Sequence, residues 1–254
     1  MTTCDFTLAL FCRVDDALQD APKHPLSLLY PSEVVTLGML HALRGGGNRA
    51  FYRWVEREMK TLFPRLPERT RLFRAFEQHA AHTQHFLAQP TFFGVVDSLG
   101  IELLHPWRFG RSPHQIGRKS YSNHRWIVGA KLALVCNRFG QVVSWTCAQA
   151  SVHDSHFHPL LLPFEKQMIV LGDQGFFLKA HQPPNLKVCP RGGWNERMTI
   201  ETVFSLLTGV LKIKKLSNRR WPALSARLAY VVAVFNLCIV WSGQVKLQLA
   251  PFAL

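Results

Sequence analysis

The stretch MIVLGDQGF (residues 168–176) is an apolar run that leads straight into an aspartate and a glycine-containing turn. Further on, RMTIETVF (residues 197–204) has a helical pattern, which places Arg197 and Glu201 one turn apart on the same face. Far upstream, a second apolar run, residues 92–96, ends in another aspartate. The acids of these three segments form a candidate metal-binding carboxylate triad: Asp97, Asp173 and Glu201.

The predicted elements around these acids form a mixed sheet. β-Rich runs bounded by turn residues predict strands at residues 92–96, 126–135, 141–148, 167–171 and 186–189. The first two connections are hairpin-like, and the later ones pass through predicted helices. This order favours an α/β fold, a ribonuclease H-like mixed sheet with flanking helices. In that topology the first and fourth strands are central neighbours, so we expect Asp97 and Asp173, at their ends, to face a common crevice.

The region before the sheet is predicted to be helical. Residues 1–30 carry little signal, and three helices then follow, at 32–43, 49–63 and 67–87. Short helices with arginines suggest a small DNA-binding bundle, and the alternative is a plain helical subdomain with a solvated basic face. We therefore predict a helical region for DNA-end binding, residues 1–89, and a ribonuclease H-like catalytic domain, residues 90–254, closed by a helix at 223–241.

The composition is that of a strongly basic globular protein. The 254 residues include 30 Lys+Arg against 16 Asp+Glu, a formal charge of +14. Such an excess points to a polyanionic partner, because neutralising phosphates releases counterions; the alternative is a basic protein without a nucleic-acid role. The six cysteines form no Cys-x-x-Cys pair and predict reduced thiols in a cytoplasmic protein. The most apolar segment, residues 228–241, is shorter than the roughly 20 residues that cross a bilayer, so we expect a buried helix and no membrane partner.

Two segments of the predicted catalytic domain are rich in cations. Residues 105–125 have no convincing period and mix aromatic with basic side chains, among them Arg118 and Lys119. This mixture suits a nucleic-acid strand through phosphate pairing and base stacking, and the alternative is a disordered surface loop. The second segment follows the Glu201 helix and carries Lys212, Lys214, Lys215, Arg219 and Arg220.

The proposed triad fits phosphoryl-transfer chemistry. Hard divalent cations such as Mg²⁺ take oxygen ligands, usually a few carboxylates and a substrate phosphate. Two such ions about 4 Å apart can assist an in-line phosphoryl displacement. In this hypothesis Asp97 touches both ions, Asp173 and Glu201 hold one each, and Arg197 steadies a phosphate.

Asp154 is the main competitor of Asp173 for a place in the triad. It follows a predicted strand, and its position at a helix start favours a role as N-cap. The adjacent histidines do not place three zinc ligands on one helical face, and no cysteine or glutamate stands at a typical zinc spacing. Two further acids lie near the candidate site in the sequence: Glu102 and Glu196.

Four short motifs resemble the landmarks of DDE transposases from bacterial insertion sequences. They are VVDS (95–98), VHDS (152–155), GDQGF (172–176) and IETVF (200–204). Other runs are similar to the insertion sequence 982 family in particular: FYRW (51–54), LFPRLP (62–67), FSLL (204–207), LKIKK (211–215) and FNLC (235–238). The resemblance implies a ribonuclease H-like fold, Mg²⁺ or Mn²⁺, and cutting and joining of DNA at terminal inverted repeats, with catalytic positions Asp97, Asp173 and Glu201. Bringing two such ends together implies a homodimer or a larger assembly on nucleoid DNA in a bacterial cytoplasm.

The chain also departs from the wider transposase pattern. The signature Tyr-x-x-Arg-x-x-x-Glu-x-x-x-x-x-x-Lys appears as Trp194, Arg197 and Glu201, with Thr208 at the lysine position. We expect Trp194 to stack on a base and Lys212, one helical turn further, to replace the lysine. Two other functions stay open: a catalytically inactive DNA-binding protein, acting as a repressor or remnant, and a ribonuclease H-like nuclease without strand transfer. The three intact acids argue against the first, and the basic amino-terminal helices favour end recognition over the second.

Overall fold

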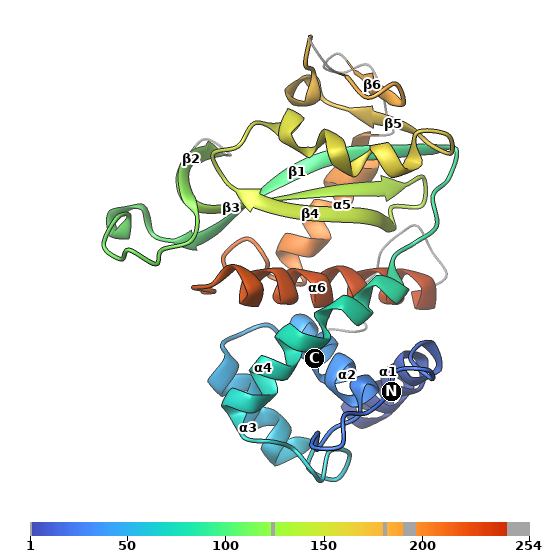
Figure 1. The fold of residues 1–254 in the computed structure, drawn as a ribbon, viewed down its shortest axis with the longest axis vertical. Coiled ribbons are helices and arrows are strands. Elements are labelled where there is room, and N and C mark those ends of the chain that lie inside the picture. Colours follow the sequence, from blue (N-terminus) through green and yellow to red (C-terminus); the bar gives the residue numbers. More distant parts are fainter. Residues whose placement is uncertain (1, 123–124, 180–181, 190–196, 243–254) are drawn as a thin grey trace. The chain divides into compact units, whose positions relative to one another are not determined.

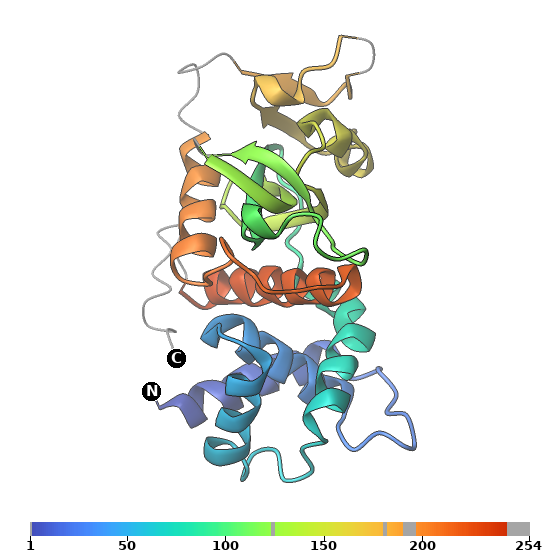
Figure 2. The ribbon, with the colours of Figure 1, turned by 90° about the vertical axis from the view of Figure 1, so that its left-hand side faces the viewer.

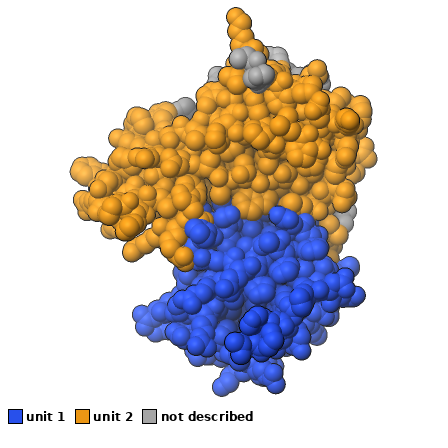
Figure 3. Space-filling model, viewed as in Figure 1, with its two compact units in different colours: residues 1–86, 222–238, 248–254 blue, residues 87–221, 239–247 orange. Residues whose placement is uncertain are grey.

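The computed structural model describes residues 2–122, 125–179, 182–189 and 197–242, and Figure 1 shows their arrangement. The described residues divide into two units, which Figure 3 distinguishes by colour. The first unit comprises residues 2–86 and Pro222–Cys238, and the second comprises Leu87–Trp221 and 239–242.

The first unit is helical. Its helices are α1 (Thr3–Ala17), α2 (Pro31–Arg44), α3 (Asn48–Glu58), α4 (Arg69–His79), the 3₁₀ segment η1 (Ala80–Phe86) and most of α6 (Trp221–Ser242). Local sequence patterns provide little indication of α1. Its start is a capping box, in which the Thr2 hydroxyl accepts from the Asp5 amide at 3.1 Å and the Asp5 carboxylate accepts from the Thr2 amide at 2.9 Å. The helix then buries one apolar stripe, including Phe6 and Leu10.

The helix α6 groups with the amino-terminal helices, whereas the sequence assigned it to the catalytic domain. The physical reason is its contacts within the first unit. The Tyr230 hydroxyl donates to the Phe76 carbonyl at 3.0 Å, and the Arg227 guanidinium donates to the His41 carbonyl at 2.6 Å. A Cβ at Gly38 would lie 2.6 Å from the Tyr230 ring, so α2 approaches α6 at a position that only glycine allows.

The same helix corrects an expectation about length. α6 has 22 residues and is long and apolar enough to cross a membrane by composition, so the length argument for residues 228–241 fails. Its burial distinguishes a core helix from a membrane span: 83% of its most apolar window is buried inside the protein. It is therefore a core helix.

We expect the stability of the first unit to fall below pH 6.5 because of His41. The pKa of His41 lies well below its ordinary 6.5, mainly because burial disfavours the charged imidazole, and also because of the Arg227 guanidinium. Below pH 6.5 the unfolded chain binds this proton and the folded chain does not, so stability is lost as pH falls, by at most about 1.4 kcal/mol per pH unit. Urea unfolding at several pH values should show a shallower loss in His41→Leu than in wild type. The exposed His24→Leu is the matched control, and an equal slope in His41→Leu and wild type would contradict the assignment.

The second unit contains a mixed six-stranded sheet. Its strands are β1 (Phe93–Leu104), β2 (Arg118–Ser122), β3 (Arg125–Asn137), β4 (Val142–Gln149), β5 (Ile169–Gly172) and β6 (Leu186–Val188). The order is β2-β3-β1-β5-β6, with β4 also paired to β3. The β1–β3 and β3–β4 pairs are antiparallel, whereas β1–β5 and β5–β6 are parallel. This topology confirms the predicted ribonuclease H-like mixed sheet, with β1 and β5 as neighbours.

One predicted strand and one predicted loop differ from the observed structure. β1 was expected to end at residue 96 but continues to Leu104, because its second half stays paired with β3 after the pairing with β5 stops at Val95. Asp97 therefore lies inside a strand and not at its end. Part of the expected loop 105–125 is β2, which forms a hairpin with the first residues of β3.

Helical segments cover both faces of the sheet, as Figures 1 and 2 show. On one face lie η3 (Asp154–Leu160) and η4 (Leu162–Phe164), the short helices between β4 and β5. Phe157 and Leu161 pack there with Val96 and Val170 in a buried cluster. On the other face lies α5 (Arg197–Gly209), which contacts β1. Because side chains alternate along a strand, Asp97 points to the opposite face from Val96, the face that α5 covers.

Candidate active site

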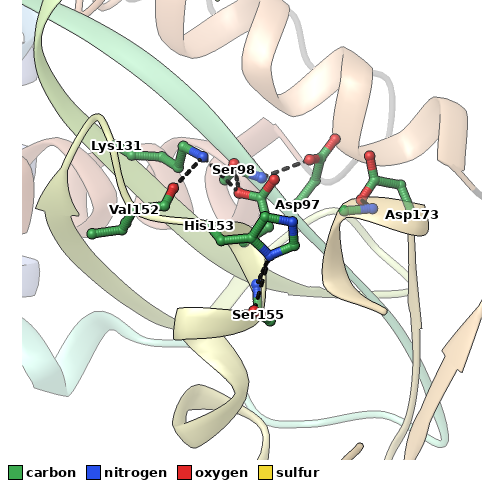
Figure 4. Close-up of polar contacts among 9 residues, drawn as sticks. Asp97, Ser98, Lys131, Val152, His153, Ser155 and Asp173 are labelled. Carbon is green, nitrogen blue, oxygen red and sulfur yellow. Dashed lines mark hydrogen bonds and ion pairs between the residues drawn. The ribbon is translucent and has the colours of Figure 1, made fainter. Parts of the chain in front are cut away.

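The parallel pairing of β1 with β5 brings two of the predicted acids onto neighbouring strands. Val95 pairs with Leu171, and Asp97 and Asp173 each follow two residues later. Asp173 comes just after β5 with extended backbone angles, and its Oδ1 accepts from the Gly175 amide at 2.9 Å at the start of η5 (Gln174–Phe176). Asp97 Oδ1 accepts from the Ser98 amide at 2.6 Å. Figure 4 shows the two carboxylates turned the same way.

The third predicted acid, Glu201, lies on α5. The buried positions Ile200, Val203 and Leu207 anchor this helix, and Glu201 itself is exposed. Among the described residues no three His, Cys, Asp or Glu side chains stand close enough together to hold a metal ion. The structure thus places Asp97 on β1, Asp173 directly after the neighbouring strand β5, and Glu201 on α5.

The residues nevertheless fit a divalent cation by the chemistry of their donors. Asp97 and Asp173 supply carboxylate oxygens, which are the ligands that Mg²⁺ and Mn²⁺ prefer. Mg²⁺ commonly takes only one or two protein carboxylates and fills its other positions with water and substrate phosphate. Two half-buried aspartates are therefore a sufficient protein contribution to such a site.

Asp154 is not the helix N-cap that its position suggested. His153 caps η3, with its Nδ1 accepting from the Ser155 amide at 3.4 Å. The Asp154 carboxylate turns to the sheet instead, where Oδ1 accepts from the Ser98 hydroxyl at 2.5 Å and pairs with Lys131 Nζ at 3.1 Å. Figure 4 shows Ser98 next to Asp97, with the Lys131 side chain reaching toward Ser98 from the side away from Asp173. In the sequence, Lys131 stands among apolar residues, and a charge in such a strand needs a partner; this was the available signal for the contact.

The expected basic residues after α5 are exposed, but they are not helical. α5 ends at Gly209, and Thr208 turns its hydroxyl back to the Phe204 carbonyl at 2.8 Å. Lys212 therefore does not lie one helical turn further; it has a left-handed backbone with φ of 54°. The exposed cations of this segment are Lys212, Lys214, Lys215, Arg219 and Arg220. Trp194 lies outside the described residues, as do Glu196 and the side chain of Arg197.

Glu102 ties this basic segment to the sheet. Its side chain is 6% exposed and forms ion pairs with Arg125 on β3, at 3.1 Å, and with Lys215, at 3.5 Å. Its backbone amide donates to the Lys214 carbonyl at 3.0 Å and its carbonyl accepts from the Leu216 amide at 2.9 Å. The acid that the sequence left without a role thus holds a row of cations against β1.

The β2–β3 hairpin presents aromatic and basic side chains together. Tyr121 and Trp126 are directly paired across the two strands, with ring centroids 5.5 Å apart, and both are more than half exposed. Lys119 Nζ lies 4.8 Å from the centre of the Trp126 ring. Arg118 is also exposed on β2. The two predicted contact residues of this region, Arg118 and Lys119, therefore lie on a β-strand.

One family model matches part of the chain. Residues 92–188 match a family model described as "Transposase DDE domain", and this segment contains Asp97 and Asp173. No curated protein matches the chain. A solved structure described as "Crystal structure of the Mos1 mariner paired end complex with Mn" is similar at 13% identity over 97% of this chain and 88% of that chain, with a TM-score of 0.28, too low to carry an argument. Neither finding singles out the insertion sequence 982 family. The segment that carries Asp97 and Asp173 thus resembles a transposase DDE domain.

Proposed function

We propose that this protein is a DNA transposase that cuts and joins DNA at terminal inverted repeats, of the insertion sequence 982 type. The observation that carries the proposal is the pair Asp97 and Asp173 on adjacent strands of a ribonuclease H-like sheet, inside a segment that matches a transposase DDE domain. The formal charge of +14 supports a DNA partner.

The proposed chemistry has two stages. Water attacks the phosphodiester at the element's end and frees a 3′-hydroxyl, which then attacks a target phosphodiester in line, with no covalent protein–DNA intermediate. Divalent cations, Mg²⁺ or Mn²⁺ and two in number, would stabilise the charge that develops on the attacking and leaving oxygens. Asp97 and Asp173 would hold these ions, and Glu201 from α5 would complete the site. The site would lie on the face of the sheet to which Asp97 points.

The basic surfaces supply the proposed DNA contacts. Arg118 and Lys119 on β2 and the row from Lys212 to Arg219 would pair with phosphates. Arg197 and Trp194 keep the roles that the sequence suggested for them, as phosphate and base contacts. The helical first unit would bind the DNA ends, and a homodimer or larger assembly would hold two ends together.

The direct test uses a labelled duplex that carries the element's terminal repeat, incubated with the wild-type protein and Mg²⁺. The proposal expects a nick that leaves a 3′-hydroxyl, followed by joined products when target DNA is present. Cleavage without joining would favour a ribonuclease H-like nuclease, and binding without cleavage would favour a repressor or remnant. Either result would overturn the proposed transposase activity.

Trp126 gives a separate test of the hairpin. We expect Trp126→Ala to weaken binding to terminal-repeat DNA about tenfold, because stacking of one base on an exposed aromatic ring contributes about 1–3 kcal/mol. Phe139→Ala is the matched control, since Phe139 is also exposed and lies under a cation, Arg138, in the other hairpin of β3. Fluorescence anisotropy with labelled DNA measures both affinities. Equal affinities of the two variants would remove the hairpin from the DNA interface.

A further inference from the structure

Asp154 is anchored to the strand that carries Asp97. Its Oδ1 accepts from the Ser98 hydroxyl at 2.5 Å, and Ser98 directly follows Asp97 on β1. The same oxygen pairs with Lys131 Nζ at 3.1 Å, and Lys131 lies opposite Gly100 across the β1–β3 ladder. Lys131 also donates to the Val152 carbonyl at 2.9 Å, so Lys131 holds the chain entering η3 both at the acid and two residues before it. Figure 4 labels Ser98, Lys131 and Val152, the partners in these contacts.

The second oxygen of Asp154 reaches the turn that carries Asp173. A Cβ at Gly175 would lie 2.8 Å from Asp154 Oδ2 and 3.0 Å from Asp173 Oδ1. Two carboxylates therefore converge on a point that only glycine leaves free. The Gly175 amide also donates to Asp173 Oδ1 at 2.9 Å, so this residue both orients one carboxylate and makes room for the other.

The charge of Lys131 makes this approach possible. Two carboxylates that converge on one point repel each other. Lys131 compensates one of the two charges, and its side chain and that of Asp154 are only 19% and 23% exposed, so solvent screens the pair weakly. The ion pair therefore lets Asp154 stand close to the Asp173 carboxylate without a second uncompensated charge.

We propose that Asp154, held by Lys131 and Ser98, is a positioning residue for Asp173. It holds the turn between β5 and η5 in position against β1, so that the Asp173 carboxylate lies beside Asp97. The inference rests on the proposed function, because it takes these two aspartates as the residues that hold divalent cations. Asp154 itself does not contact the cation; it acts through Gly175 and the turn.

The test measures Mn²⁺ binding to the DNA-free protein by electron paramagnetic resonance. Asp154→Asn keeps the shape and the acceptor for Ser98 but removes the ion pair, and Gly175→Ala places a methyl group between the two carboxylates. We expect each variant to bind Mn²⁺ at least tenfold more weakly, the usual effect of removing an outer partner of a ligand. The matched controls are Glu165→Gln, an exposed acid of the same unit, and Gly209→Ala, where an added Cβ meets nothing within 4 Å. Both controls should bind Mn²⁺ like wild type.

Thermal unfolding separates positioning from folding. A loss of Mn²⁺ affinity in Asp154→Asn at an unchanged melting temperature supports the inference, and unchanged affinity in that variant overturns it, whether or not Gly175→Ala folds. The proposed function fails separately. If Asp154→Asn weakens Mn²⁺ binding yet wild type neither cuts nor joins terminal-repeat DNA, the positioning role stands and the transposase proposal falls. If wild type cuts and joins DNA while Asp154→Asn binds Mn²⁺ normally, only the positioning role is wrong.

Discussion

Asp97→Asn should cut terminal-repeat DNA on the order of 1,000-fold more slowly than wild type, about 4 kcal/mol in activation free energy. The change removes one negative charge but keeps the side-chain shape and the oxygen that accepts from the Ser98 amide. In the proposed site this charge helps to hold the cations that stabilise the reacting phosphate. We expect the same loss for Asp173→Asn, which keeps the acceptor for the Gly175 amide. Single-turnover cleavage with Mg²⁺ measures both rates.

The control for charge is Glu165→Gln, which neutralises an exposed acid of the same unit. It should cleave at the wild-type rate. DNA affinity, measured by gel shift, should not fall in Asp97→Asn or Asp173→Asn, because both changes make the protein more basic. Cleavage within a few-fold of wild type by either variant would remove that aspartate from the site. Glu201→Gln tests the third acid, which only the sequence places in the triad.

Phe176→Ala should lower the free energy of unfolding of the second unit by about 3–5 kcal/mol. Phe176 is fully buried in the cluster that joins β1, β5 and η3, and its carbonyl is bonded to the His158 ring at 2.6 Å. Truncation to alanine removes apolar contacts and leaves a cavity under the turn that holds Asp173. Denaturant unfolding followed by circular dichroism measures the change.

The neighbouring residue provides the control. Phe177 is 53% exposed, so Phe177→Ala should cost less than about 1 kcal/mol, as surface substitutions usually do. Equal losses in the two variants would mean that the buried cluster does not support the turn. Because the turn lies between core and site, Phe176→Ala should also weaken cleavage by the folded fraction.

Much of the second unit was predictable from local patterns. Apolar runs such as residues 167–171 are bounded by turns, and a buried strand of this kind can be recognised without knowing its partners. The order of predicted strands and helices along the chain then favoured a ribonuclease H-like topology. In that topology the strands that lead to Asp97 and Asp173 are neighbours. The end of β1 was not predictable in this way, because its extension to Leu104 depends on pairing with β3, far away in the sequence.

The roles of individual acids were harder to infer. Asp154 has the local position of an N-cap, but Ser98 and Lys131, 56 and 23 residues away, offered its carboxylate stronger partners. Glu102 carried no local signal, and its ion pairs come from β3 and from the segment after α5. In both cases the energy of a charge depends on the partners that folding brings to it and not on its neighbours in the chain.

The sequence established the class of the sheet, the basic character of the protein and the two strand aspartates, since each depends on residue type and short-range periodicity. Tertiary contacts determined the rest: α6 belongs with the amino-terminal helices because Tyr230 and Arg227 find their partners there. They also direct the Asp154 carboxylate to Ser98 and Lys131 on the sheet, where its position in the sequence suggested a helix cap. Hydrogen bonds and ion pairs between distant residues have no periodic signature, so only the folded chain reveals which polar groups meet.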